Sequence, residues 1–194
     1  VLSQGRDCIS EIPAERWDHS HYYSADEDAP GKTYARWGGF IDGVTEFDPA
    51  FFGISPREAA AMEPQERLFL QTAHEAIEDA GYTRQGLAAS ARQDDVEGMV
   101  GVFVGVTYEE YQLYGAQQTA EGRPLVLSMS PSSIANRVSF VNGFHGPSMA
   151  IDAMCASSLT TIHLACQSLR SGECQVALAG GVNVSIHPAK FLML

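Results

Sequence analysis

The stretch Ser148-Met-Ala-Ile-Asp-Ala-Met-Cys-Ala-Ser-Ser-Leu159 decides the fold. Met149 to Ile151 form a short apolar run of strand length. From Ala156 to Arg170, apolar residues recur at three- and four-residue spacing, which predicts a helix, and Gly172 follows as its C-terminal cap. Cys155 therefore lies between a predicted buried strand and a helix N-terminus, where unpaired amides and the helix dipole favour an anion. Such an elbow exposes and activates a thiolate nucleophile.

A buried, inert cysteine is the competing interpretation of Cys155, because most free cysteines are structural. The chain has four cysteines, and no two of them form a C-x-x-C pair, which argues against a zinc or thioredoxin-type site. Cys155 and Cys166 are about 16 Å apart along a helix axis, too far for a disulfide. Four unpaired thiols predict a reducing cytoplasm.

Composition excludes several classes of partner. The 194 residues are 45% hydrophobic, enough for one substantial core, and carry a formal net charge of −12. This charge argues against nucleic acid and against an anionic membrane surface. No apolar run approaches the roughly 20 residues that span a bilayer, and no signal peptide opens the chain. Because it starts at Val1 and stops inside the apolar run Phe191–Leu194, the sequence is expected to be a fragment cut at both ends.

Several helices are predicted upstream of the elbow. Ser55-Pro56-Arg57-Glu58 is a capping box with proline at the first helical position. A longer amphipathic helix is predicted from Pro64 to Ala80, with Phe69, Ala73 and Ile77 on one face. Another begins at Ser130-Pro131 and ends at Asn142-Gly143.

The strands alternate with these helices. Met99–Val106 is apolar throughout, as expected of a central strand buried on both faces, and Gln175–Val184 is a second such run. Gly180-Gly181 inside that run marks a place where another backbone approaches closely. Strands separated by helices predict an α/β layered fold with a mostly parallel central sheet.

Three segments give weaker predictions. Residues 1–37 are expected to be irregular but packed, because their aromatic side chains require burial. Residues 82–98 are interpreted as a polar connection, and residues 107–127 as a mobile-looking region that contains Tyr108, Tyr111 and Tyr114. The N-terminal aromatic residues concerned are Trp17, Tyr22, Tyr23, Tyr34 and Trp37.

The elbow resembles the Asp-Thr-x-Cys-Ser-Ser-Ser-Leu active-site motif of β-ketoacyl synthases, the condensing enzymes of fatty acid and polyketide synthesis. The likeness extends over nearly the whole chain, and its leader and Phe-Phe-Gly-Ile-Ser-Pro segment are similar to ketosynthase domains of modular type I polyketide synthases. Tyr108–Gly115 is most similar to assembly lines that lack built-in acyltransferases. The other matching segments are Glu11–Asp18, Gly38–Asp42, Phe47–Ala59, Met62–Leu68, Glu75–Gly81, Ala135–Ser139, Gly146–Ser148 and Ala179–Asn183.

The resemblance implies a thiolase-like fold, layered α/β/α, of which residues 1–194 form a partial ketosynthase domain, the N-terminal half. It implies that Cys155 accepts an acyl chain from the phosphopantetheine arm of an acyl carrier protein, before decarboxylative condensation with a malonyl-type extender. Sulfur suits this role as both nucleophile and leaving group, and the Cys155 amide is expected to form half of an oxyanion hole. No cofactor or metal is expected to bind directly. The family dimerises, which here predicts a homodimer through residues 148–153.

The chain departs from the family pattern in two ways. Ala153 and Ala156 replace the threonine and serine beside the cysteine, and these small changes are expected to alter acyl preference at most. The family's two catalytic histidine motifs, His-Gly-Thr-Gly-Thr and Asn-x-Gly-His, do not occur before Leu194. By itself the chain is therefore expected not to condense. None of its six histidines is expected to substitute: His19, His21, His74, His145, His163 and His187.

Two alternative functions stay open at this point. One is a non-elongating, ketosynthase-like domain that transfers acyl chains without condensing them, and only the histidine motifs would discriminate it. The other, of a different class, is a non-catalytic structural or docking domain, although such relatives typically lose the cysteine that is present here as Cys155. A Cys–His hydrolase is a further reading, for which no suitably placed histidine can be named.

Overall fold

Three parallel strands form the centre of the larger of two compact units, Thr45–Asn183. The structure, a computed structural model, describes residues 1–123 and 130–193. The middle strand β3 (Val100–Gly105) pairs with β4 (Ser148–Ile151) on one side and β5 (Val176–Gly181) on the other. All six residues of β3 are buried, which confirms the predicted central strand. The flanking strands are only partly buried, because each has one unpaired edge among the described residues.

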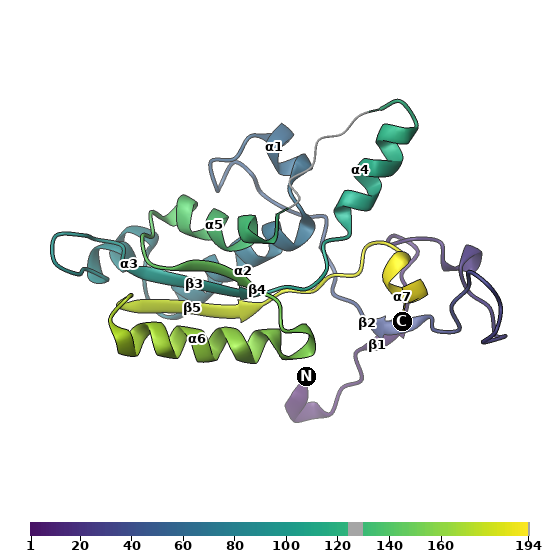
Figure 1. Ribbon diagram of the computed structural model, residues 1–194, viewed down its shortest axis with the longest axis horizontal. Helices are drawn as coiled ribbons and strands as arrows, with labels where there is room; N and C mark the ends of the chain where they lie inside the picture. Colours follow the sequence, from purple (N-terminus) through teal and green to yellow (C-terminus); the bar gives the residue numbers. More distant parts are fainter. Residues whose placement is uncertain (124–129, 194) are drawn as a thin grey trace. The chain divides into compact units, whose positions relative to one another are not determined.

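Helices cover both faces of this sheet, which confirms the predicted α/β/α layers (Figure 1). On one face lies α5 (Pro131–Asn142), backed by α2 (Pro64–Asp79), and on the other lies α6 (Ser157–Ser171). The α5 helix ends at Gly143, whose φ of 68° favours glycine because it carries no Cβ. Its inward residues include Ile134, Ala135 and Val138, each fully buried.

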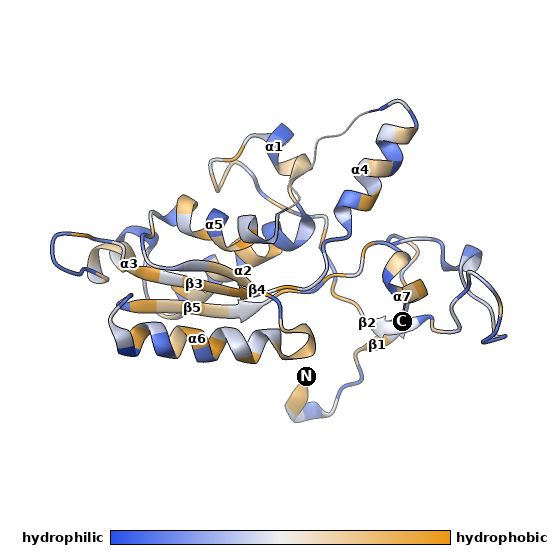
Figure 2. Ribbon diagram, in the orientation of Figure 1, coloured by the Kyte–Doolittle hydropathy of each residue, from blue (hydrophilic) through white to orange (hydrophobic). Residues whose placement is uncertain are grey.

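The apolar stripe that predicted α6 faces away from the sheet. Leu159 is 74% exposed and Ile162 48% exposed, and Cys166 and Leu169 are exposed as well. Figure 2 shows β3 as mostly hydrophobic and α6 as a mixture of hydrophobic and hydrophilic positions. The helix lies on the sheet through small or hydroxylated residues, which allow a close approach: Ser157, Thr161, Ala165 and Ser168. Periodicity therefore identified the helix but not its sheet-facing side.

Two further helices lie in segments where the sequence predicted no helix. α3 (Arg84–Ser90) lies in the predicted polar connection, and its N-cap Thr83 accepts a hydrogen bond from the Gly86 amide at 3.0 Å. α4 (Tyr111–Ala120) lies within residues 107–127, of which residues 124–127 are outside the described part. Both helices bury one residue, so neither has the apolar periodicity that identifies a helix. The capping box of α1 (Pro56–Ala61) is as predicted, with Ser55 accepting from the Glu58 amide.

The smaller unit comprises Val1–Val44 and Val184–Leu194. Its strands β1 (Ile9–Glu11) and β2 (Trp37–Gly39) are antiparallel, and short helices complete it: η1 (Leu2–Gln4), η2 (His19–His21) and α7 (Ala189–Met193). Trp17 is buried and packs edge-on against Phe191. The prediction that the five N-terminal aromatics are buried holds for Trp17 and only in part for Tyr22 and Tyr23, which are half-buried. It is wrong for Tyr34, which is 60% exposed, and for Trp37, which is 57% exposed.

No helix within residues 1–123 and 130–193 combines the length and the apolar composition needed to cross a membrane.

Candidate active site

The turn that follows β4 presents Cys155 at the carboxyl end of the sheet. Asp152 and Ala153 leave the strand, Met154–Ala156 form the 3₁₀ turn η3, and α6 starts at Ser157. The predicted strand–cysteine–helix elbow is therefore present, although its strand is a sheet edge and not fully buried as expected. Cys155 is an exposed free thiol.

Two side chains hold the turn before Cys155. The Asp152 carboxylate accepts hydrogen bonds from the Met154 amide and from the Thr107 hydroxyl, both at 2.9 Å. The Ser157 hydroxyl accepts from the Ala153 amide at 2.9 Å and donates to the Met154 carbonyl at 2.7 Å. Thr107 follows β3, so these bonds join the ends of two adjacent strands to the first turn of α6.

Glycine allows the start of α6 to lie close to the sheet. Gly105 and Gly181 are register partners at the carboxyl ends of β3 and β5. A Cβ on Gly105 would lie 2.9 Å from the carbonyl carbon and the Cβ of Ser157, and a Cβ on Gly181 would lie 2.2 Å from the Ser158 hydroxyl oxygen. Thr161 adds a hydrogen bond to the Gly180 carbonyl at 3.2 Å. Because Gly105 has no side chain, the start of α6 and the cysteine turn before it can lie this close to the sheet.

Substituting Gly105→Ala is expected to destabilise the complete domain by about 1–3 kcal/mol, because the new methyl group meets backbone that cannot rotate away. The displaced turn should also slow alkylation of Cys155. Urea unfolding and the rate of iodoacetamide labelling would measure the two effects. Gly39→Ala in strand β2 is the control, since its Cβ would meet nothing within 4 Å. Equal stability of the two variants would show that the close approach at Gly105 does not matter.

The other thiols lie in different surroundings. Cys174 is buried, with its sulfur 3.3 Å from the Ser168 hydroxyl oxygen, whereas Cys8 and Cys166 are exposed. Among the four cysteines, only Cys155 directly follows the carboxyl end of a strand in the parallel sheet. Open α/β sheets bind their ligands at the carboxyl ends of their strands.

The histidines lie in structural settings. His145 donates its backbone amide to the Gly98 carbonyl at 2.7 Å, at the amino end of β3, whereas Cys155 follows the carboxyl end of the sheet. His74 lies against Phe51 and Phe52, with Nε2 3.4 Å from a Glu78 oxygen. His163 is exposed on α6. Within the described ranges, no group of three or more His, Cys, Asp or Glu side chains is placed to hold a metal ion.

A buried ion cluster lies at the start of α2, and the sequence did not single it out. Glu66 is fully buried, and its carboxylate accepts from Arg137 Nε at 2.9 Å and from the Ser133 hydroxyl at 2.8 Å. Arg137 also contacts Glu58 at 2.7 Å. Burial alone would lower the pKa of Arg137, but the two carboxylates raise it overall. The pair joins α2 to α5.

Two carboxyl groups beside this pair have perturbed pKa values. Burial raises the pKa of Glu63 to about 7, although its carboxylate accepts a hydrogen bond from the Tyr111 amide at 3.1 Å. Burial and the nearby Glu66 charge raise the pKa of Glu109 to about 7. Folding therefore takes up protons at these groups between about pH 4.5 and pH 7.

Stability from these carboxyl groups is expected to be present below about pH 4.5 and lost as pH rises to about 7, since both folded pKa values are raised. Glu63→Gln keeps an acceptor oxygen for Tyr111 and removes the titration. The variant should therefore gain on the order of 2 kcal/mol over the wild type above pH 7, measured by urea unfolding across pH. Glu75→Gln, at an exposed site on the same helix, should leave the pH slope unchanged. A slope unaltered by Glu63→Gln would contradict the assignment.

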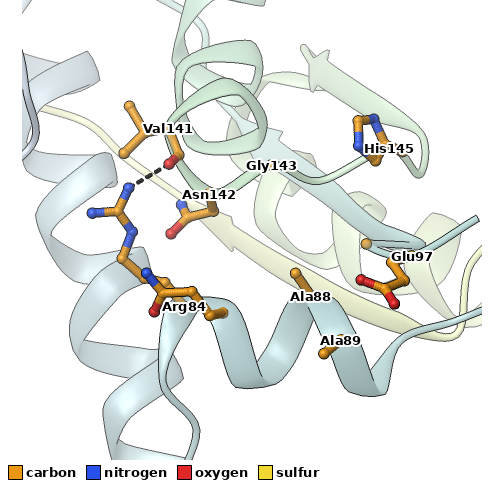
Figure 3. Close-up of a pocket in the computed structure, with 10 residues that line it drawn as sticks. Arg84, Ala88, Ala89, Glu97, Val141, Asn142, Gly143 and His145 are labelled. Atoms are coloured by element: carbon orange, nitrogen blue, oxygen red, sulfur yellow. Dashed lines mark hydrogen bonds between the residues drawn. The ribbon is translucent and has the colours of Figure 1, made fainter.

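A cavity of about 330 Å³ lies at the opposite end of the sheet (Figure 3). It is lined by α3, by the end of α5 and by the segments around Gly98 and His145. Figure 3 shows Arg84 directed across it to the Val141 carbonyl, which the guanidinium caps at the end of α5. None of the predicted site residues lines it, and Arg84 is occupied in holding two helices together.

The residues that sequence reasoning missed fall into two groups. Asp152 and Ser157 belong to the motif that was recognised, but their spacing around Cys155 gave no sign of which backbone groups they bind. Glu66 and Arg137 lie in two of the segments that match the family. Their opposite charges could have been used to predict an ion pair between these segments. Thr107 gave no signal beyond its position after a predicted strand.

Comparison with known proteins identifies relatives for the whole chain. The family model for the N-terminal domain of β-ketoacyl synthases matches residues 1–194. The chain is 66% identical over 193 residues to the polyketide synthase PksL of Bacillus subtilis strain 168, and 62% identical over 193 residues to the polyketide synthase ThaG of Burkholderia thailandensis. It covers 4% and 3% of the length of these two relatives.

Solved ketosynthase structures have the same fold. An oxazolomycin ketosynthase domain of Streptomyces albus JA3453 matches with a TM-score of 0.91 and 51% identity, over 98% of this chain and 32% of that one. A ketosynthase from module 6 of the bacillaene synthase of Bacillus subtilis 168 matches with a TM-score of 0.81 and 33% identity, over 99% of this chain and 29% of that one. The chain thus spans about a third of these solved relatives, and the predicted thiolase-like α/β fold is confirmed.

Proposed function

Because the chain belongs to the β-ketoacyl synthase family, we propose that it carries the acyl-accepting part of a polyketide ketosynthase, with Cys155 as the nucleophile. The single observation that carries the proposal is the exposed Cys155 thiol, on a turn held by hydrogen bonds, at the carboxyl end of the parallel sheet.

The proposed reaction moves an acyl group from one thioester to another. The Cys155 sulfur attacks the acyl carbonyl carbon of a chain held on an acyl carrier protein's phosphopantetheine, and a new carbon–sulfur bond forms. The carbon–sulfur bond to phosphopantetheine then breaks, and that sulfur leaves with the proton that Cys155 gave up. One thiol and one thioester are consumed and one of each is formed, so no oxidant or cofactor is needed.

Acyl loading tests the proposal directly. The complete domain would be incubated with an acyl N-acetylcysteamine thioester, and the acylated residue would be located by peptide mass spectrometry. We expect the added mass on Cys155, with Cys166 as the internal control, because it is an exposed thiol on the helix that follows. Equal loading of the two cysteines, or no loading at either, would refute the assignment.

Condensation needs more than this chain provides. We propose that an extender, a malonyl-type thioester on a second carrier protein, loses carbon dioxide and attacks the Cys155 thioester. The family's histidine motifs for that step are not among these residues, and we assign the step to the complete domain.

The likeness to PksL and ThaG supports a parent assembly line that lacks built-in acyltransferases. The free thiols are compatible with a reducing cytoplasm, which we propose as its compartment.

A homodimer through residues 148–153 is part of the proposal. Strand β4 is an edge of the sheet among the described residues, and Met149 on it is 40% exposed. An unpaired edge with exposed apolar side chains is able to pair with the same edge of a second copy. Light scattering on the complete domain should give the mass of a dimer, and a monomer at micromolar concentration would contradict this interface.

A further inference from the structure

The backbone immediately before Cys155 has an unfavourable conformation. Met154 has a φ of 53°, a value that side chains with a Cβ rarely adopt. Such a conformation is unfavourable, and it persists only where the surrounding structure holds it in place. The only other described residue of this kind, glycine excepted, is Asp94.

Both polar groups of the Met154 backbone are bound by side chains. Its N–H donates to the Asp152 carboxylate, and its carbonyl accepts from the Ser157 hydroxyl. The Ser157 backbone amide donates to the same carbonyl. Ser157 is buried at 6% exposure. Its oxygen accepts the Ala153 amide, and its hydroxyl hydrogen is donated to the Met154 carbonyl.

The Met154 carbonyl and the Cys155 amide belong to one rigid peptide group. None of the peptide bonds in the described chain is cis, so in this group the N–H points opposite to the C=O. By fixing the direction of the Met154 carbonyl, Ser157 therefore also fixes the opposite direction, along which the Cys155 N–H points. This amide is the donor that would face the oxygen of an acyl group under attack by the Cys155 sulfur.

We propose that Ser157, together with Asp152, is a positioning residue for acyl transfer: its hydroxyl aims the Cys155 amide at the acyl oxygen by holding the Met154 carbonyl. This inference rests on the proposed role of Cys155 as nucleophile. In the step concerned, the sulfur adds to the carbonyl carbon, the carbonyl electron pair moves to oxygen, and the Cys155 N–H stabilises that oxyanion. Collapse expels the donor thiolate, which takes the proton lost by Cys155.

Two reactions of the same sulfur separate this role from a structural one. Acyl transfer passes through an oxyanion, whereas alkylation by iodoacetamide displaces iodide at a saturated carbon and forms none. Ser157→Ala is therefore expected to slow acylation of Cys155 by an acyl N-acetylcysteamine thioester about 10- to 100-fold. Alkylation by iodoacetamide should stay within about twofold of the wild type, because the thiol remains exposed.

The control is Ser158→Ala, which removes a hydroxyl group one position later and leaves the hydrogen bond to the Met154 carbonyl in place. Its rates of acylation and of alkylation should both stay near those of the wild type. Parallel loss of acylation and alkylation in Ser157→Ala, or no loss of either, would overturn the proposal. If Ser157→Ala fails to fold, the Asp152 variants decide. Asp152→Asn keeps an acceptor for the Met154 amide and should retain acylation, whereas Asp152→Ala should lose it selectively. Equal acylation by these two variants would also overturn the proposal.

Failure of this inference is distinguishable from failure of the proposed function. A wild-type domain that takes no acyl group on Cys155 refutes the function itself, whatever the variants do. A wild-type domain that loads Cys155 normally, with Ser157→Ala loading at the same rate, refutes the positioning role alone.

Discussion

Replacing Cys155 by alanine is expected to lower chain elongation by the complete synthase by at least about 10⁴-fold. Without the sulfur no acyl-enzyme can form, and the extender then has no electrophile in the site to attack. The turn itself should persist, because the bonds from Asp152 and Ser157 hold backbone groups and not the thiol. Mass spectrometry of the product released from carrier-protein-loaded synthase would measure the effect.

Cys166→Ala is the matched control, because Cys166 is exposed on the adjoining helix but lies outside the turn. We expect wild-type elongation from it. Elongation by Cys155→Ala would eliminate the nucleophile assignment. A wild-type protein that loads Cys155 but never elongates would instead identify the non-elongating acyl-transfer domain, and a wild type that does neither would favour a structural or docking domain.

The second large effect concerns stability. Arg137→Ala is expected to destabilise the complete domain by about 3–5 kcal/mol, because it leaves the Glu66 carboxylate buried without its cation. The Glu66 side chain is fully buried, so water cannot solvate its charge when Arg137 is removed. The Ser133 hydroxyl is neutral and compensates the charge less well than a guanidinium. Urea denaturation of the wild type and the variant at neutral pH would measure the difference.

Arg92→Ala supplies the control, since Arg92 pairs with Glu97 at the surface, where both side chains are more than half exposed. Such a pair contributes about 0–1 kcal/mol. Adding Glu66→Gln to Arg137→Ala should restore part of the stability, because the unpaired charge is then removed. A loss in Arg137→Ala no larger than that in Arg92→Ala would mean that the α2–α5 pair is not needed for folding.

Local sequence patterns predicted the elements whose determinants lie within them. The capping box at Ser55, the start of α5 at Pro131 and its end at Gly143 all depend on neighbouring residues, and all are found. The fully apolar β3 could only be a strand buried on both faces. By contrast, α3 and α4 were missed, because each buries a single residue and shows no periodic apolar face.

The α6 helix shows how a correct element prediction leaves its packing open. Apolar spacing identifies a helix wherever its stripe is buried, but it does not say what buries it. In this chain Leu159 and Ile162 are exposed, and Thr161 and Ala165 meet the sheet instead. The close approach predicted at Gly180-Gly181 is real, although at Gly181 the nearest group is the Ser158 side chain and not a backbone.

The sequence by itself determined the layered α/β fold, the family and the candidate nucleophile Cys155, because strand and helix periods and a contiguous motif are local properties of the chain. Only the tertiary structure decided which groups act on that motif. Thr107 is 45 positions from Asp152, and Glu66 is 71 positions from Arg137, so no local pattern relates them. Their contacts exist because parallel strands bring their carboxyl ends together and because α2 and α5 pack on the same face of the sheet.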